Sequence, residues 1–543
     1  MRDALLVAAA EIAKEFQCSP DLVRRATVHF QQQLREGLSR NGAAISCIPS
    51  HVTSMPNGAE KGIYLAVDVG GTNLRVCSVT LHGDKTYSLT ESKVVIPQSV
   101  RLGAASKDFF GFVALQIQQF LKENDLHKVG DGTVVGSERE TYPLGMTFSF
   151  AFEQLGVNQG ILLKWDKDFN IPDAVGKDVG SLLQRELEAL QLPVVIATLT
   201  NDTVGTLMAR SYTSPGKGDT LLGAVFGTGT NGAYMERIPD ITKLAGTRQD
   251  SSSYMAINTE WGGFDNNLSV LELTRFDRQV DATSANPGLE RFEKLISGLY
   301  LGEILRLAIL ELIRQTMEDD HTPFAIPASS NLYQAWSIES SLLSVLAADK
   351  SAELFPSRLA LEKTLDWRNP SINDAKSIQV ISTAIGKRSA RLAGVAVAGI
   401  ILQSGRLQHM VQTEHTYLWP YRSFSQAVLG CMRMAMFFVR RIWSSIWHVR
   451  RSRVADPERA DSTSNLLPCA EQSQDDTATL DIGLTGSLAE HYPGYQEIIR
   501  TTLRDVEQIG HHGEALVRFG LTKDGSTVGA ALVAQAAMAR KDS

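Results

Sequence analysis

A strand–turn–strand device that occurs twice constrains the fold of this chain more than any other feature. In each copy, two apolar runs predict strands and enclose a turn of glycine and threonine. Residues 63–69 and 74–81 enclose the turn at 70–73, and residues 221–226 and 233–237 enclose the turn at 227–232. One copy in each half of the chain predicts a duplicated architecture.

The chemistry of these turns points to phosphate. Glycine lets a backbone approach a phosphate closely, and successive N–H groups in a turn form a concave anion site. Asp68 comes just before the first turn, where a carboxylate can hold Mg²⁺ directly or through water. The alternative is that both segments are ordinary hairpins without a ligand.

Apolar spacing predicts helices between and after these strands. The predicted helices span residues 20–39, 106–122, 289–317, 332–348, 376–404 and 529–539. A chain of 543 residues exceeds what a single core usually supports, so we expect at least two lobes.

A candidate general base follows a predicted buried strand at 193–200. Asn201 and Asp202 come directly after this strand, and strand ends are where α/β proteins keep their ligands. The carboxylate of Asp202 could accept a proton from a substrate hydroxyl during phosphoryl transfer. The alternative for Asn-Asp at a strand end is a turn or a helix cap.

Amides and carboxylates suited to binding sugar hydroxyls occur further along the chain. Asn258 and Glu260 lie in one polar segment, and Glu293 lies in another. Each such side chain can bond two hydroxyl groups. In isolation these residues would count as surface polar groups.

Several stretches taken together resemble the eukaryotic hexokinase and glucokinase family, over roughly residues 20–405 and again 480–540. The matching stretches are LAVDVGGTNLRV, LTNDTVGTLMA, GAVFGTGTNGAY, AINTEWGGFDN, FEKLISGLYLGEILRL, GKRSARLAG and GSLAEHYPGY. The resemblance implies an α/β, actin-like ATPase (hexokinase) fold with two lobes around an interlobe cleft. It also implies a hexose as substrate, with ATP and Mg²⁺.

The resemblance implies a division into lobes. Residues 1–61 would form an N-terminal helical segment packing on the large lobe, and 62–202 the small lobe. Residues 203–528 would form the large lobe, and 529–543 a C-terminal helix that returns to the small lobe.

The resemblance also implies roles for individual residues. Asp202 would be the catalytic base for the sugar 6-hydroxyl, with Lys167 as the lysine of the sugar loop. The implied sugar ligands are Asn201, Asn231, Asn258, Glu260 and Glu293, with Asp166 in the same loop as Lys167. The implied nucleotide-binding residues are Asp68, Gly70, Gly71, Thr72, Asn73, Arg75, Gly227, Thr228, Gly229, Gly486 and Ser487, and Asp68 is the implied Mg²⁺ ligand, directly or through water.

The sugar loop departs from the family pattern at two places. The family usually has proline and a small residue where Ala151 and Phe152 stand, so we expect a looser loop with a bulky ring facing the sugar. The family's threonine is Asp166 here, and an ionised carboxylate can only accept hydrogen bonds. Its negative charge near Asp202 opposes the charge stabilisation that phosphoryl transfer requires.

The nucleotide side departs as well. Thr485 stands where the family has aspartate, and Thr527 where it has glycine. A β-branched residue in place of glycine is expected to crowd the nucleotide or distort the turn.

Residues 410–480 differ in composition from their surroundings. Residues 417–453 are rich in Trp, Phe, Met and Arg, and 456–476 are polar and acidic. Three interpretations stay open: a translated intron in the gene model, a basic amphipathic segment for a membrane surface or a protein partner, and a disordered loop without a role.

Composition restricts the class of protein. The net charge of −7 argues against a general nucleic-acid binder. The five widely spaced cysteines indicate reduced thiols. Asp3 and Glu11 interrupt the N-terminal apolar run, so we expect no secretory signal. These features predict a cytoplasmic protein, with the nucleus and the mitochondrial surface as open alternatives.

Two functions compete. The departures in the sugar and nucleotide loops favour a hexokinase-family protein with weak or lost kinase activity, a role in sugar sensing and regulatory protein partners. The complete set Asn201, Asp202, Asn231, Glu260 and Glu293 favours the alternative, an active ATP-dependent hexokinase that phosphorylates the 6-hydroxyl of a hexose. A purely structural role is the third possibility.

Overall fold

The structure is a computed structural model that describes residues 2–71, 73–103, 105–126, 141–165, 169–215, 220–244, 254–317, 325–410 and 479–541. Its contacts divide the chain into two units, Met1–Ser404 with Thr479–Ser543, and Gly405–Ala478. The predicted insertion at 410–480 falls almost entirely within the second unit, and its segments 417–453 and 456–476 lie outside the described residues. The account below concerns the first unit.

A five-stranded sheet has the strand order β4-β3-β2-β5-β8. Its strands are β2 (Lys61–Val69), β3 (Asn73–His82), β4 (Tyr87–Val95), β5 (Tyr142–Phe148) and β8 (Val194–Thr200). The β4–β3 and β3–β2 pairs are antiparallel, whereas β2–β5 and β5–β8 are parallel. A separate hairpin consists of β6 (Ala151–Gly156) and β7 (Gln159–Lys164).

A six-stranded sheet has the order β1-β11-β10-β9-β12-β13. Its strands are β1 (Ile48–Pro49), β9 (Thr220–Phe226), β10 (Thr230–Arg237), β11 (Tyr254–Asn258), β12 (Leu480–Thr485) and β13 (Val517–Leu521). The β11–β10 and β10–β9 pairs are antiparallel, and β9–β12 and β12–β13 are parallel. Five strands therefore repeat the direction pattern of the first sheet, which is the duplication that the two turns predict.

The helices of the first unit complete the fold. They are α1 (Arg2–Lys14), α2 (Pro20–Ser39), α3 (Gln98–Arg101), α4 (Ser106–Glu123), α5 (Val179–Ala189), α6 (Asp202–Thr213), α7 (Arg275–Thr283), α8 (Arg291–Ile296), α9 (Gly298–Met317), α10 (Ser341–Ala348), α11 (Phe355–Leu365), α12 (Ile372–Ser404), α14 (Ser487–His491), α15 (Tyr495–Asp505), α16 (Gly510–Ala515) and α17 (Gly525–Lys541). None of the helices in the described residues is long and apolar enough to cross a membrane.

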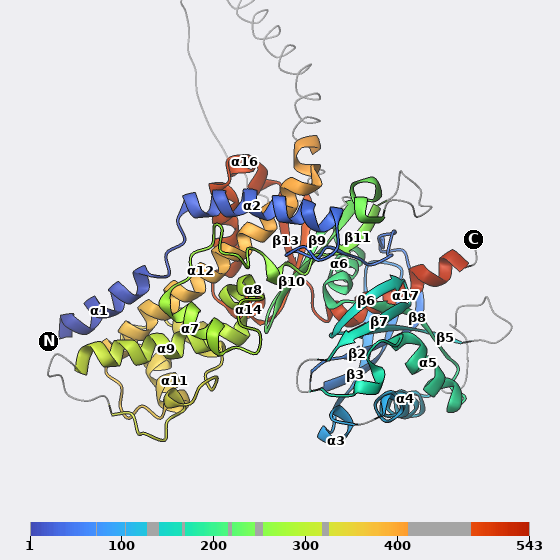
Figure 1. Cartoon of the computed structure of the whole chain (residues 1–543), viewed down its shortest axis with the longest axis horizontal. Helices are drawn as coiled ribbons and strands as arrows, with labels where there is room; N and C mark the ends of the chain where they lie inside the picture. The colour runs from blue at the N-terminus through green and yellow to red at the C-terminus, as the bar shows by residue number, and fades with distance from the viewer. Residues whose placement is uncertain are drawn as a thin grey trace, which may run out of the picture. The chain divides into compact units, whose positions relative to one another are not determined.

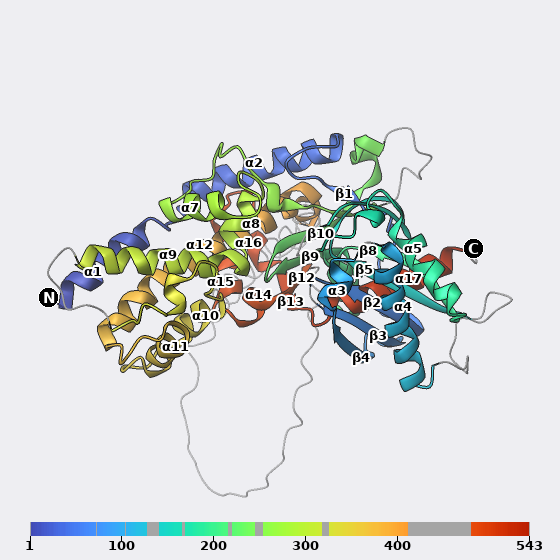
Figure 2. The same ribbon diagram turned by 60° about the horizontal axis from the view of Figure 1, so that its bottom comes forward.

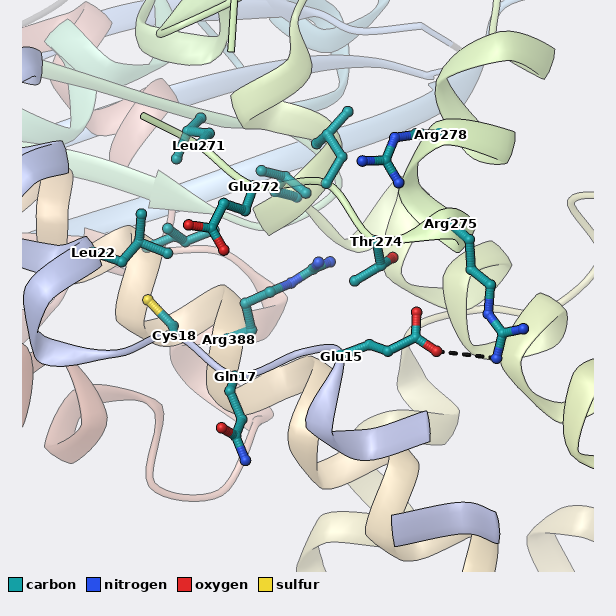
Figure 3. A pocket seen from close by; sticks show the side chains of 13 residues that line it. Glu15, Gln17, Cys18, Leu22, Leu271, Glu272, Thr274, Arg275, Arg278 and Arg388 are labelled. Carbon is teal, nitrogen blue, oxygen red and sulfur yellow. Dashed lines mark ion pairs between the residues drawn. The ribbon is translucent and has the colours of Figure 1, made fainter. Parts of the chain in front are cut away.

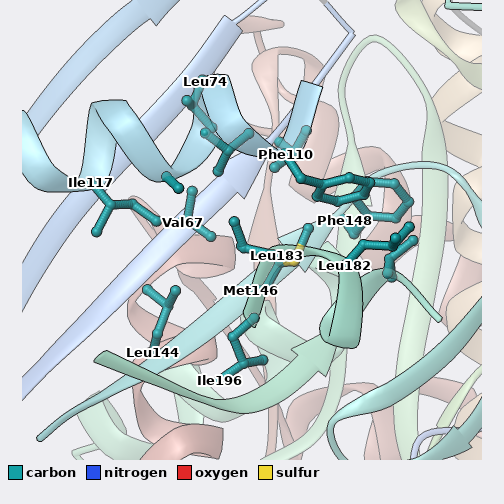
Figure 4. Close-up of a cluster of buried hydrophobic side chains, with 14 of the residues drawn as sticks. Val67, Leu74, Phe110, Ile117, Leu144, Met146, Phe148, Leu182, Leu183 and Ile196 are labelled. Atoms are coloured by element: carbon teal, nitrogen blue, oxygen red, sulfur yellow. The ribbon is translucent and has the colours of Figure 1, made fainter. Parts of the chain in front are cut away.

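Alternation along β2 divides the two faces of the five-stranded sheet. Leu65, Val67 and Val69 pack with residues of α4 and α5 in one buried cluster, shown in Figure 4. Tyr64 and Ala66 face the other way and join a second cluster with residues of α6 and α17. The sheet is therefore covered on both faces, as Figures 1 and 2 also show.

Helices α6 and α17 pack on each other between the two sheets. Helix α17 contacts β2, β5 and β8, and α6 contacts β9, β10 and β12. The helices cross at glycines, since a Cβ on Gly529 would collide with the carbonyl oxygen of Gly205. Any larger residue would force the helices apart.

The N-terminal segment contacts the second sheet and its helices. Strand β1 pairs with β11, and α1 and α2 both contact α12. Ser19 caps α2 by accepting a hydrogen bond from the amide of Leu22 at 3.1 Å. The lobe boundaries at residues 62, 203 and 529 stay predictions.

Two predicted helices are shorter or divided in the structure. The span 289–317 is divided at Ser297, because the amide of Gly298 donates to the carbonyl of Gly227 at 2.7 Å and begins a new helix, α9. The span 332–348 is helical only from Ser341, and Trp336 within it has a left-handed backbone. In the first case a long-range contact overrides a continuous apolar pattern.

Candidate functional site

The predicted sugar ligands gather at the ends of β10 and β11 and at the start of α8. Asn231 lies in β10, Asn258 ends β11, and Glu260 follows two residues later. The amide of Asn231 donates to Oδ1 of Asn258 at 2.8 Å and to Oε1 of Glu260 at 3.1 Å. The amide of Asn258 donates to the same Glu260 oxygen at 2.7 Å. We call these three residues, with Glu293, the sugar network.

Glu293 joins this network through the second glycine turn. Its Oε1 accepts a hydrogen bond from the amide of Thr230 at 3.2 Å. A Cβ on Gly229 would lie 2.7 Å from the same oxygen, so only glycine leaves room for the carboxylate there. The turn at 227–229 and the network therefore form one structural unit.

Asn258 is more buried than a direct sugar ligand needs to be. It is 6% exposed, and both its amide and its carbonyl oxygen are engaged within the network. This position suits a residue that orients Asn231 and Glu260, whereas the sequence places Asn258 among the sugar ligands.

Glu260 has two features typical of functional residues. Its φ of 51° is in the left-handed region, which costs energy for a residue other than glycine. Burial raises the pKa of its carboxyl to about 7, and the negative charges of Asp202 and Glu290 add to this shift. Asp202 is therefore close enough to Glu260 to influence its ionisation.

Asn201 and Asp202 lie where the parallel strand β8 meets α6. Oδ1 of Asn201 accepts hydrogen bonds from the amide of Thr203 at 2.9 Å and from its hydroxyl at 2.7 Å, which caps α6. Its amide nitrogen makes no hydrogen bond within the described residues, so it can still donate to a ligand. Asp202 is the first residue of α6, whose N-terminus favours its negative charge. Asn201 can thus cap α6 through its side-chain oxygen and also donate to a ligand through its amide nitrogen.

The first glycine turn is connected to α6 through the C-terminal turn. The hydroxyl of Ser526 lies 3.4 Å from Oδ2 of Asp68, and a Cβ on Gly205 would lie 2.8 Å from the carbonyl oxygen of Ser526. The amide of Gly70 bonds the carbonyl of Asn73 at 3.0 Å and closes the turn. The guanidinium of Arg75, two residues after Asn73 in β3, lies 3.8 Å from the carboxylate of Asp524.

The predicted adenosine-side loop lies against the second glycine turn. A Cβ on Gly227 would be 3.3 Å from Cα of Gly486, and Gly486 has a φ of 104° that favours glycine. The amide of Gly486 and the hydroxyl of Thr485 both donate to Glu490, at 3.0 and 3.4 Å. Ser487 begins α14. Thr485 therefore stabilises the loop through its hydrogen bond to Glu490.

Three predicted site residues, Thr72, Asp166 and Lys167, lie outside the described residues. Gly71 is described in the first turn, and Thr228 accepts a hydrogen bond from the amide of Leu299 through its carbonyl at 3.1 Å. The structure thus brings the described candidate sugar ligands together. The first glycine turn lies near Ser526, and the second lies against Glu293 and Gly486.

Phe152 is partly buried and packs on the edge of an apolar core. Its ring packs against the small-sheet core, with its centroid 6.2 Å from that of Phe148, and a Cβ on Gly160 would meet it at 2.6 Å. The residue lies in β6, where alternation turns this side chain toward the apolar core. The ring therefore contacts the core, and the expectation that it faces the sugar stays a prediction.

Thr527 is buried, and the expectation that it crowds the nucleotide stays a prediction. It is 1% exposed within the first turn of α17. Its hydroxyl is buried without a hydrogen-bond partner among the described residues. The added methyl group is accommodated inside the fold.

Sequence reasoning missed Glu290. Its carboxylate lies against Gly262, where a Cβ would collide with Oε2, and its charge acts on Glu260. Burial raises the pKa of Glu290, whereas Lys164 and Lys294 lower it. Its position three residues before Glu293, at the N-cap of α8, was the available signal.

The donor set fits a nucleotide-bound Mg²⁺ better than a resident metal. The described residues contain no group of three or more His, Cys, Asp or Glu side chains arranged to hold a metal ion. Mg²⁺ is usually held by one or two carboxylates together with phosphate oxygens. Asp68, beside a glycine turn, meets that requirement.

Comparisons with known proteins identify the family of this chain. Two family models described as Hexokinase match residues 8–212 and 221–536. A glucokinase of Aspergillus niger is 42% identical and aligns over 98% of this chain and 97% of its own length. Hexokinase-2 of Schizosaccharomyces pombe is 33% identical, with 98% of each chain aligned.

A solved structure supports the fold. The hexokinase of Schistosoma mansoni, complexed with glucose, superimposes with a TM-score of 0.71 at 27% identity, covering 99% of this chain and 100% of that one. The predicted α/β, actin-like ATPase fold is thereby confirmed. With duplicated sheets, paired glycine turns and these matches over nearly its whole length, the chain is a member of the hexokinase family.

Proposed function

We propose that this chain is an active ATP-dependent hexose 6-phosphotransferase with glucose among its substrates. The observation that carries the proposal is the sugar network, assembled within reach of the charge of Asp202. The glucokinase relative and the glucose-bound structural relative support the same substrate class.

The network has the chemistry needed to orient a sugar. The carboxylates of Glu260 and Glu293 can each accept from two hydroxyl groups, and the amide of Asn201 can donate to one. Asn258 holds Asn231 and Glu260 in position from behind. Because the set is preorganised by hydrogen bonds, little side-chain freedom is lost when the sugar binds.

Asp202 is the proposed general base. Its carboxylate accepts the proton of the sugar 6-hydroxyl as that oxygen forms a bond to the γ-phosphorus and the bond to the ADP leaving oxygen breaks. The products are a hexose 6-phosphate and ADP, with the proton released later to solvent.

The glycine turns are the proposed phosphate side. ATP supplies the phosphoryl group, and its Mg²⁺ neutralises charge on the phosphates. Asp68 and the turn at 70–73 are placed to bind one part of the polyphosphate, and the turn at 227–229 with Gly486 another. Asp68 would hold the metal directly or through water.

The hypothesis of weak or lost activity is less well supported than this one. It relied on Phe152, whose ring packs into the core, and on Asp166, which lies outside the described residues. The relatives that align over nearly the whole chain have the names glucokinase and hexokinase. They give no support to a sensing role or a regulatory partner.

A coupled assay of ADP release tests the proposal. The purified chain is supplied with Mg²⁺–ATP and with glucose, fructose or mannose, and Asp202→Ala is the matched control. We expect hexose-dependent turnover on the order of 1–100 s⁻¹, the usual range for kinases. A folded chain that binds glucose but releases no ADP would instead support the regulatory hypothesis.

A further inference from the structure

A second pocket lies away from the sugar network and the glycine turns. It has a volume of about 320 Å³, which reaches the lower end of the range for ligand sites. Figure 3 shows it between the link from α1 to α2, the segment that leads into α7, and α12. No residue that lines it belongs to the predicted sugar or nucleotide set.

The pocket is rich in guanidinium groups. Arg275, Arg278 and Arg388 line it, together with Glu15 and Glu272. Arg275 is paired with Glu15 at 3.0 Å and with Glu311 at 2.7 Å. The side chain of Arg278 has no ion pair or hydrogen bond among the described residues, and Figure 3 shows it directed toward the pocket. One cation at this site is therefore available.

Arg388 supplies a second unused donor. Its two terminal nitrogens bond Asp277 at 2.6 and 2.8 Å, and its guanidinium lies 4.9 Å from the ring centroid of Phe16. The Nε atom is buried and has no hydrogen-bond partner within the described part of the chain. The residue is 4% exposed, so this donor is fixed in place. Arg388 therefore contributes a fixed positive charge to the pocket wall.

The remaining wall is largely apolar. Leu22, Leu271, Leu295 and Leu392 line the pocket and are all buried. Cys18 contributes its thiol beside them, and burial raises the pKa of that thiol. A ligand with an aliphatic body would therefore displace water from apolar surface.

We propose that this pocket binds a small organic carboxylate with a short aliphatic body. The carboxylate accepts hydrogen bonds from the guanidinium of Arg278, the positive charge of Arg388 lies in the pocket wall, and the aliphatic part lies along the leucines. A guanidinium is well matched to a carboxylate in geometry and charge. Glu15 and Glu272 at the same pocket disfavour a doubly charged phosphate, because like charges repel in a partly desolvated site.

The direct test uses the full-length chain and hexanoate as the probe. Binding is measured by isothermal titration calorimetry at millimolar hexanoate, beside hexan-1-ol, which lacks the charge, and inorganic phosphate, which lacks the aliphatic body. We expect hexanoate to bind about tenfold or more tightly than either comparison compound, since both the charged hydrogen bonds and the apolar contact are needed.

A pair of variants assigns the binding to this pocket. Arg278→Gln should weaken hexanoate binding about tenfold, because it removes the free guanidinium. Arg185→Gln, which changes another exposed arginine on α5, should leave it unchanged. Equal binding to both variants, or no hexanoate binding to the natural chain, would overturn the proposal.

Alkylation of Cys18 gives a readout at the site itself. The rate of iodoacetamide labelling at alkaline pH is followed by mass spectrometry of the peptide that contains Cys18. Hexanoate should slow this rate severalfold in the natural chain, and by much less in Arg278→Gln. Labelling that hexanoate does not slow, even where calorimetry detects binding, would place the ligand elsewhere and contradict the proposal.

Discussion

The two sheets repeat one strand pattern but carry different chemistry at the same structural position. In the first sheet, the last parallel strand β8 leads into α6 through Asn201 and Asp202. In the second, the last parallel strand β13 leads into α17, whose first two residues are Gly525 and Ser526. The backbone device is the same, whereas one junction provides a carboxylate and the other provides glycine and a hydroxyl.

The glycine turns differ in the same way. The first has Asp68 before it and lies near Ser526. The second packs against Glu293, which belongs to the sugar network, and against Gly486. The comparison teaches that duplication supplied two equivalent places for binding charged groups. In the proposed function, the junction with Asp202 serves the reacting hydroxyl and both glycine turns serve phosphate.

The largest expected effect tests the difference between the two strand–helix junctions. Asp202→Ala should lower kcat by roughly 100- to 10,000-fold, the usual contribution of a general base. Ser526→Ala, at the corresponding junction, should lower it by less than about tenfold, because it removes only a hydroxyl. The coupled ADP assay measures both, with circular dichroism to verify folding. Similar losses in the two variants would show that the junctions are not chemically distinct.

The next effect tests how the two repeats are joined. Gly529→Ala should destabilise the fold by about 2–4 kcal/mol, because its Cβ would collide with the backbone of Gly205. Gly111→Ala is the matched control: it is also helical, and its Cβ would lie 3.6 Å from Glu186. That substitution should be neutral or stabilise by up to about 1 kcal/mol.

Urea denaturation measures both glycine variants. If Gly529→Ala is as stable as the natural chain, the helices can separate at this point without cost. The close crossing of α6 and α17 would then not constrain how the two repeats pack.

A smaller effect concerns the charge that the sugar network carries. Burial, with Asp202 and Glu290, raises the pKa of Glu260 from 4.5 to about 7. The folded chain therefore holds this proton more tightly than the unfolded chain does. The contribution of Glu260 to stability is full below about pH 4.5 and is lost as the pH rises through 7.

Stability measured from pH 5 to 8 checks this linkage. Relative to Glu260→Gln, which cannot ionise, the natural chain should lose roughly 1–2 kcal/mol over that range. Glu353→Gln, at an exposed position, serves as the control and should follow the natural chain. Parallel curves for the natural chain and Glu260→Gln would mean that Glu260 ionises normally.

The smallest expected effect tests the packing of the β6–β7 hairpin. Phe152→Ala should cost about 1–2 kcal/mol of stability, because the ring packs against Phe148 and the core. It should change the KM for glucose by less than about threefold, since the ring contacts the apolar core. An increase in glucose affinity of tenfold or more would restore the idea that this ring obstructs the site.

The sequence by itself determined the duplicated device, the candidate base and most of the elements. Both glycine turns, the strands that flank them and the cap of α2 follow from local patterns, because short-range sterics and capping decide them. The candidate base Asp202 could also be predicted from the sequence, since it closely follows a recognisable strand. The family resemblance added roles for residues such as Glu260, whose chemistry alone would not distinguish it from a surface carboxylate.

Only the tertiary structure decided which side chains meet. The break at Ser297 exists because the amide of Gly298 bonds a carbonyl far away in sequence. The inward direction of Phe152 depends on the pairing of β6 with β7, which a loop pattern does not specify. The burial of Asn258, the charge of Glu290 beside Glu260 and the unused Nε of Arg388 likewise depend on long-range packing. The physical reason is that a residue's pattern of neighbours along the chain sets its local conformation, whereas its burial and its electrostatic partners come from elements that fold against it from elsewhere in the sequence.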